Sequence, residues 1–72
     1  MTKEAFLKKL GKRIVAVRKE RGITQSELAR LCGKDRGSIY KVEVGEFNPS
    51  IFYLTQLASA LKVKLSELVD ID

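Results

Sequence analysis

The sequence has no histidine and no tryptophan, and only one cysteine and one proline among its 72 residues. With Cys32 alone and no histidine, neither an internal disulfide nor an ordinary zinc site can be built, and a catalytic Cys–His pair is excluded. The acidic residues are scattered along the chain, at positions where solvated charge is usual. We therefore expect no metal, no cofactor and no enzymatic activity.

Long apolar runs are also missing, since none exceeds four residues, as at 14–17, far short of the roughly 20 that span a bilayer. The first residues, Met1 to Glu4, show no signal-peptide pattern. We expect a cytoplasmic protein without membrane contact. The length predicts a single domain over residues 1–72, with a small core.

The formal net charge of +5 is unevenly distributed along the chain. Residues 1–22 contain eight lysines and arginines against two glutamates, whereas residues 46–72 contain two lysines against four acidic residues. This asymmetry suggests one side that faces a polyanion and another side for assembly. On charge alone, a merely solvated basic face is an equal alternative.

Composition and periodicity favour an all-α fold, because helix-forming residues are abundant and β-branched stretches separated by turn residues are few. Apolar residues recur at intervals of three and four positions, which predicts an amphipathic helix over residues 4–21, ended by Gly22. Its expected inner face consists of Phe6, Leu7, Leu10, Ile14 and Val17. A capping-box pattern, Thr24-Gln25-Ser26-Glu27, predicts a second helix that ends at Gly33. Its inner residues would be Leu28, Ala29 and Cys32.

Three more helices are predicted in the second half. Asp35 is a candidate cap for a third helix, which Gly45 would end and whose inner positions are Ile39 and Val42. Asn48-Pro49-Ser50 would open a fourth helix. Its expected stripe is Ile51, Leu54, Leu57, Ala58 and Leu61. A short fifth helix, about residues 64–70, would contribute Leu65 and Leu68.

Residues 24–45 therefore read as two short helices joined by a tight turn through Gly33. This outline is typical of a helix-turn-helix, which presents its second helix to the major groove of DNA. Generic helical hairpins share the outline, so the spacing alone does not decide between the two.

Particular residues in and around this unit carry a resemblance to a known family. They are Thr24-Gln25-x-Glu27-Leu28-Ala29-x-x-Cys32-Gly33, Ile39-x-x-Val42-Glu43-x-Gly45, Asn48-Pro49-Ser50 and Leu57-Ala58-x-Ala60-Leu61. Over about residues 10–70, the pattern resembles the Cro/C1-type (XRE family) repressor domain. The resemblance implies a compact five-helix domain with a central helix-turn-helix. It also implies a sequence-specific transcriptional regulator that binds double-stranded DNA, as a homodimeric repressor on a pseudo-palindromic operator.

The resemblance further implies which residues face the DNA backbone. Gln25 matches a glutamine that binds a phosphate at the start of the second helix, where backbone N–H groups and the helix dipole assist. An ordinary polar first-turn residue is the alternative for Gln25. Thr24, Ser26 and Asn48 are further phosphate candidates.

Base reading is assigned to the third helix. Arg36 and Lys41 match positions that reach base edges in the family, and both side chains suit the guanine O6/N7 pair. Gly37 and Ser38 are small enough for close approach, and Ser38 is a candidate donor to a base or phosphate. Tyr40 would touch a thymine methyl group or a phosphate, with simple exposure as its alternative.

Arg18 and Glu43 match an ion pair that in this family joins the first helix to the end of the recognition helix. Such a pair would orient the reading helix, although desolvation offsets much of its attraction. Two independent solvated charges are the alternative.

Some positions depart from the family pattern. Lys34 stands where an apolar residue usually packs, so we expect either a looser turn or a lysine stem lying over the core. Lys62 and Lys64 replace a helix-ending glycine and a small polar cap, which makes that boundary uncertain. Cys32 is expected to be a small core residue, with a redox switch as the alternative.

The remaining apolar residues of the C-terminal half are assigned to a homodimer interface: Phe47, Phe52, Tyr53, Val69 and Ile71. Capping of the core edge is an equal alternative for them. The first three also support a different function, a protein-interaction module of the same fold, such as an antitoxin-like partner of a toxin. The basic face of Arg36 and Lys41 argues against that function. RNA binding is a weaker alternative still, because the chain lacks an aromatic stacking platform.

Overall fold

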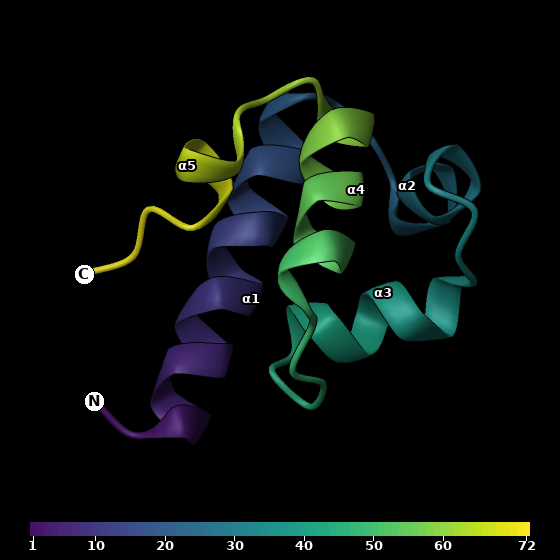
Figure 1. Cartoon of the computed structure of the whole chain (residues 1–72). Helices are drawn as coiled ribbons and strands as arrows, with labels where there is room; N and C mark the ends of the chain where they lie inside the picture. The colour runs from purple at the N-terminus through teal and green to yellow at the C-terminus, as the bar shows by residue number, and fades with distance from the viewer.

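The computed structural model describes residues 1–72 as five α-helices without strands (Figure 1). They are α1 Lys3–Glu20, α2 Gln25–Leu31, α3 Arg36–Glu43, α4 Ile51–Leu61 and α5 Leu65–Leu68. In Figure 1, α2 and α3 lie to one side of α1 and α5 lies to the other. The predicted all-α class and helix order are confirmed, with α1 shifted by one residue and α5 shorter than expected. None of the five helices has both the length and the apolar character of a membrane span.

Four helices begin where a hydroxyl or carboxylate accepts a backbone N–H from the first turn. Thr2, Thr24, Asp35 and Ser50 accept from the third helical residue, at distances of 2.7–3.1 Å. The predicted capping box is present, since the Glu27 carboxylate also accepts the Thr24 N–H at 3.1 Å. This hydrogen bond lowers the pKa of Glu27. Each cap satisfies an N–H group that has no partner inside its helix.

The helix ends are set by backbone conformation. Gly33 follows α2 with a φ of +67°, which allows the chain to turn sharply into α3. After α4 the same left-handed conformation is adopted by Lys62, with φ 58° and ψ 42°. Helix α4 therefore ends at the expected boundary without the usual glycine. For a residue with a β-carbon, this conformation costs about 1–2 kcal/mol. At Lys64 there is no side-chain cap, and only the Glu67 carboxylate reaches back to its N–H, at 3.5 Å.

The core collects the inner faces of all five helices around Ile14, Leu28, Ile39, Leu57 and Leu68, each completely buried. Two residues predicted to be internal are not. Phe6 is 42% exposed and Ile51 is 67% exposed. Ile51 is the first residue of α4, whereas Phe6 lies next to the buried Leu7, so one side of α1 and not its whole beginning is left uncovered.

Helices α1 and α3 come into backbone contact at Gly11, a residue without a predicted role. A β-carbon at Gly11 would lie 2.2 Å from the carbonyl oxygen of Glu43 and 2.8 Å from that of Val42. No side chain fits in this space. The only sequence signal was an isolated glycine inside a helical pattern, and it marks the place where the C-terminal end of α3 rests on α1.

Candidate nucleic-acid interface

Helices α2 and α3 form the predicted helix-turn-helix. The turn between them is tight, because the Lys34 N–H donates to the Ala29 carbonyl oxygen at 2.8 Å. Helix α3 buries Ile39, Val42 and Glu43 against the rest of the fold. Its opposite face remains in solvent, with these exposed residues: Arg36, Gly37, Tyr40 and Lys41.

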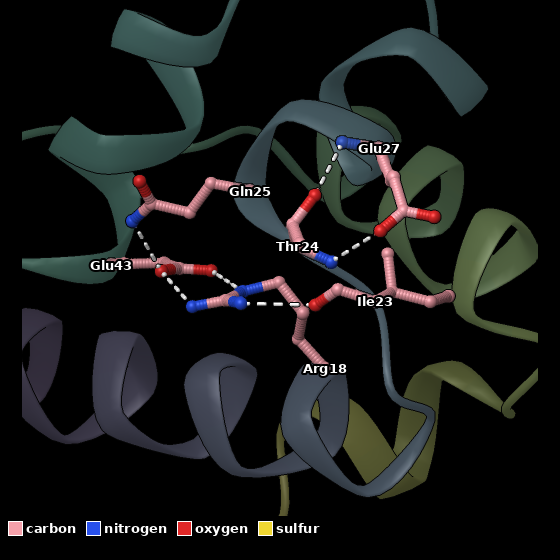
Figure 2. A network of polar contacts seen from close by, with 6 residues as sticks. All are labelled: Arg18, Ile23, Thr24, Gln25, Glu27 and Glu43. Atoms are coloured by element: carbon pink, nitrogen blue, oxygen red, sulfur yellow. Dashed lines mark hydrogen bonds and ion pairs between the residues drawn. The ribbon is translucent and has the colours of Figure 1, made fainter.

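A buried polar network holds the C-terminal end of α3 (Figure 2). The Arg18 guanidinium donates through Nε to Glu43 Oε2 at 2.7 Å and through Nη2 to Glu43 Oε1 at 3.0 Å. Arg18 Nη1 also donates to the Ile23 carbonyl oxygen at 3.0 Å. The side chain of Glu43 is only 3% exposed and that of Arg18 is 11% exposed. The bidentate pair therefore joins α1, the segment before α2 and α3 in a fixed geometry.

Gln25 belongs to the same network. Its Nε2 donates to Glu43 Oε1 at 2.8 Å, so one carboxylate oxygen accepts from both Arg18 and Gln25. In Figure 2 the carbonyl oxygen of Gln25 is directed away from Glu43. The first residue of α2 is thus oriented by the last residue of α3, an interaction that the sequence did not indicate.

Beside the start of α2 lies an open hollow of about 600 Å³ with a basic lining. It brings together Thr24, Gln25 and Ser26, the predicted phosphate contacts, with Arg36 and Lys19. Donor groups and positive charge on an open surface suit a phosphate. Asn48, the fourth phosphate candidate, is exposed in the loop between α3 and α4 and lines no part of this hollow.

Another hollow, of about 310 Å³, lies beside α3. Gly37, Ser38 and Lys41 line it together with Asp35 and Phe47. Of the predicted base-reading residues, Arg36 thus lines the hollow beside α2, three others line this one, and Tyr40 lines neither. Ser38 differs from the others, because it is half-buried and its hydroxyl lies 2.5 Å from the Tyr53 hydroxyl.

The residues assigned to a dimer interface lie in two separate places. Phe47 and Phe52 are 40% and 71% exposed near the start of α4. Val69 and Ile71 are half-buried against the core, and Ile71 lies beside Lys9 and Arg13 of α1. Tyr53 is half-buried and packs against the core. The structure does not bring the five residues into one surface.

The α2–α3 turn also shows how its unusual residues are accommodated. Lys34 Nζ lies 4.3 Å from the centroid of the Tyr53 ring, so the lysine stem covers the edge of the core and the turn stays tight. The Cys32 thiol donates to the Leu28 carbonyl oxygen at 2.9 Å, and burial raises its pKa. A thiol held in the protonated form agrees with the structural interpretation of Cys32.

Comparison with known proteins is consistent with this geometry. Residues 14–68 match the family model HTH_3, described as helix-turn-helix. The chain is 38% identical over 60 residues to the immunity repressor protein of Bacillus phage phi105, which covers 83% of this chain and 42% of the relative. It is 36% identical over 62 residues to the HTH-type transcriptional regulator y4dJ of Sinorhizobium fredii, which covers 86% of this chain and 80% of the relative. The chain thus spans less than half the length of the phage repressor that it matches.

One solved structure is similar over nearly its entire length. It is the restriction-modification controller protein C.AhdI from Aeromonas hydrophila, with a TM-score of 0.90 and 37% sequence identity. The similarity covers 94% of this chain and 99% of that chain. The five-helix fold, the exposed third helix and these matches agree, and the chain therefore belongs to the HTH_3 family of helix-turn-helix DNA-binding transcriptional regulators, the Cro/C1-type (XRE) group.

Proposed function

We propose that this chain is a sequence-specific repressor that inserts α3 into the major groove and binds a pseudo-palindromic operator as a homodimer. The observation that carries the proposal is the arrangement of α3: its outer face is exposed and basic, while its inner face is locked by the Arg18–Glu43–Gln25 network. A reading helix must be both accessible and rigid, because base contacts depend on side-chain placement. The names of the phage repressor and the controller protein support a regulatory role of this kind.

We propose that α2 and α3 contact different parts of the DNA. Gln25, Thr24 and Ser26 at the start of α2 contact a phosphate, which fixes the register of the protein on the duplex. Arg36 and Lys41 then reach base edges from α3, assisted by Gly37 and Tyr40. Asn48 is proposed as a further phosphate contact from the neighbouring loop.

This division predicts different effects for phosphate and base residues. Arg36→Ala is expected to cost about 1–3 kcal/mol of binding free energy on the preferred operator and much less on unrelated DNA. Lys41→Ala is expected to relax preference at a different base pair. Gln25→Ala is expected to weaken binding to every duplex by a similar factor, because the backbone is the same in each.

The measurement is binding of each variant to a selected operator, to its single-base-pair changes and to an unrelated duplex, all at one salt concentration. Ser66→Ala is the control for Gln25→Ala, since Ser66 is exposed on α5 and lines neither hollow, and it is expected to leave binding to every duplex unchanged. If Arg36→Ala and Lys41→Ala both weaken every duplex equally, α3 does not read sequence as proposed.

A homodimer is proposed because apolar side chains remain in solvent on a very small protein. Ile51 and Phe52 are 67% and 71% exposed at the start of α4, and Leu31 is 49% exposed at the end of α2. Small domains of this kind gain stability from association. A two-fold dimer would place two copies of α3 about 34 Å apart, one turn of DNA.

Sedimentation velocity tests this prediction directly. We expect a monomer–dimer equilibrium that Phe52→Ser shifts toward monomer, while Ser66→Ala, a change at an exposed position of α5, leaves it unchanged. A strict monomer at high micromolar concentration, both free and on operator DNA, would contradict the dimer.

The same exposed residues favour one alternative function, a module that binds a protein partner. If that were the main function, neither the unmodified protein nor Phe52→Ser would prefer one DNA sequence over another. Sequence-specific binding by the unmodified protein distinguishes the two functions.

A further inference from the structure

We infer that Tyr53 positions the first turn of the recognition helix α3, and that Ser38 influences DNA reading through Tyr53 instead of by touching a base. The inference rests on the proposed DNA-binding function and adds a residue to it. Tyr53 lies on α4, outside the helix-turn-helix, and the function so far described gives it no part in recognition.

Tyr53 is held in place by one contact of its backbone and two contacts of its ring. Its backbone N–H donates to the Ser50 hydroxyl at 3.0 Å, which fixes the residue in the first turn of α4. Its ring packs against Phe47, with centroids 5.5 Å apart and planes tilted by 57°. The Lys34 ammonium lies 4.3 Å from the ring centroid, on the side of the α2–α3 turn. The phenol is therefore a fixed point to which α3 can be attached.

The partner of this hydroxyl is fixed as well. The Ser38 backbone N–H donates to Asp35 Oδ1 at 2.7 Å, so the serine occupies a defined place in the first turn of α3. The two hydroxyl oxygens lie 2.5 Å apart, within the range of a strong O–H···O hydrogen bond. Whichever hydroxyl donates, the Ser38 side chain is directed at Tyr53 and is therefore poorly placed to contact a base. Burial raises the pKa of Tyr53, so the phenol keeps its proton at neutral pH.

Helix α3 is consequently fixed at both ends by side chains of other helices. Arg18 holds Glu43 at the C-terminal end, and Tyr53 holds Ser38 at the N-terminal end. Losing the second attachment lets the helix pivot about the first. Arg36 lies seven residues from Glu43, about 10 Å along a helix, so a tilt of roughly 6° moves its backbone by about 1 Å. Lys41, close to the pivot, would move by only about 0.3 Å.

This lever predicts a specific signature for Tyr53→Phe, which removes one oxygen atom and preserves the ring. Affinity for the selected operator is expected to fall by about three- to tenfold, the loss of one net hydrogen bond. Preference is expected to relax at the base pair read by Arg36 more than at the pair read by Lys41. Ser38→Ala should produce the same profile, and the double variant should lose no more than either single variant.

The controls separate positioning from folding and from direct contact. Ser38→Thr retains the hydroxyl and is expected to restore most of the affinity that Ser38→Ala loses. Tyr40→Phe removes an exposed hydroxyl from α3 that has no partner within the chain, so it should not reproduce the selective loss at the Arg36 position. Thermal unfolding checks that each variant remains folded at the temperature of the binding experiment.

Amide hydrogen exchange tests the inference without DNA. In Tyr53→Phe, we expect faster exchange at the Ser38 and Ile39 amides, which donate to Asp35, and unchanged exchange in the last turn of α3. Unchanged exchange at both amides would overturn the inference. So would a large binding loss in Ser38→Ala with none in Tyr53→Phe, since Ser38 would then read DNA directly. If the unmodified protein shows no sequence preference, the proposed function fails, whereas the exchange result still decides the role of Tyr53.

Discussion

Gly11→Ala is expected to destabilise the fold by about 2 kcal/mol or more, although alanine is the better helix former by about 1 kcal/mol. The contact with α3 turns the expected gain in stability into a loss, because the added β-carbon would lie 2.2 Å from the Glu43 carbonyl oxygen. The atoms that it meets belong to the helix backbone and cannot rotate away, so α1 and α3 must separate. A protein of this size has only about 4–11 kcal/mol of stability, and a large part of it would be lost.

Thermal unfolding followed by circular dichroism measures this effect, and we expect a fall in Tm on the order of 10 °C. Gly37→Ala is the matched control, since Gly37 is also helical but its β-carbon would meet only the Asp35 carboxylate oxygen, at 3.2 Å. That variant is expected to change stability by about 1 kcal/mol or less. A Gly11→Ala protein as stable as the unmodified chain would show that α1 and α3 do not approach as described.

Arg18→Ala is expected to lower stability by about 3 kcal/mol and to weaken operator binding at least tenfold in the protein that remains folded. The substitution removes two hydrogen bonds to Glu43 and one to Ile23. It leaves a nearly buried carboxylate with Gln25 as its remaining partner. Breaking one side of a buried ion pair is costly because the other charge stays desolvated. The end of α3 then loses its orientation.

A double-mutant cycle with Glu43→Ala tests whether the pair acts as a unit. Arg18→Ala with Glu43→Ala should be clearly less destabilised than the sum of the single variants, since no orphaned charge remains. Simple additivity, in stability and in binding, would mean that Arg18 and Glu43 act independently.

The salt dependence of binding separates this indirect role from a phosphate contact. Arg18→Ala should leave the slope of log affinity against log salt unchanged, because its guanidinium is committed to Glu43. Lys19→Ala is the comparison, since Lys19 is exposed and lines the basic hollow beside the start of α2, as Arg18 does. If Lys19 contacts a phosphate, that variant should reduce the slope by about one.

Much of this fold follows from local rules that operate within a few residues. Thr24 and Glu27 form a capping box, Asp35 caps α3, and Gly33 and Gly45 have positive φ where a helix must end. These effects depend on the backbone and its nearest side chains, so they can be recognised without knowing what lies across the core. The apolar periodicity likewise identified the buried residues in the middle of each helix, including Ile14 and Leu57.

The candidate DNA-binding residues were assigned by resemblance, and their positions in the structure are compatible with the proposal without testing it. Arg36, Lys41 and Tyr40 are exposed on α3, and Gln25 is at the start of α2. Two features could not be derived from the pattern. The Gln25 amide is shared with Glu43, and the Ser38 hydroxyl is engaged by Tyr53. Both are contacts between residues at least 15 positions apart.

The sequence by itself thus determined where helices start and stop and which face of each is apolar, because hydrogen-bonding caps and a 3.6-residue period act locally. It did not decide which residues of an apolar stripe are covered by a neighbouring segment, and Phe6 and Ile51 remain exposed. Nor did it decide how α3 is attached to α1 and α4. Those attachments at Gly11 and Tyr53 depend on the packing angle and separation of helices distant in the chain, quantities that only the tertiary structure decides.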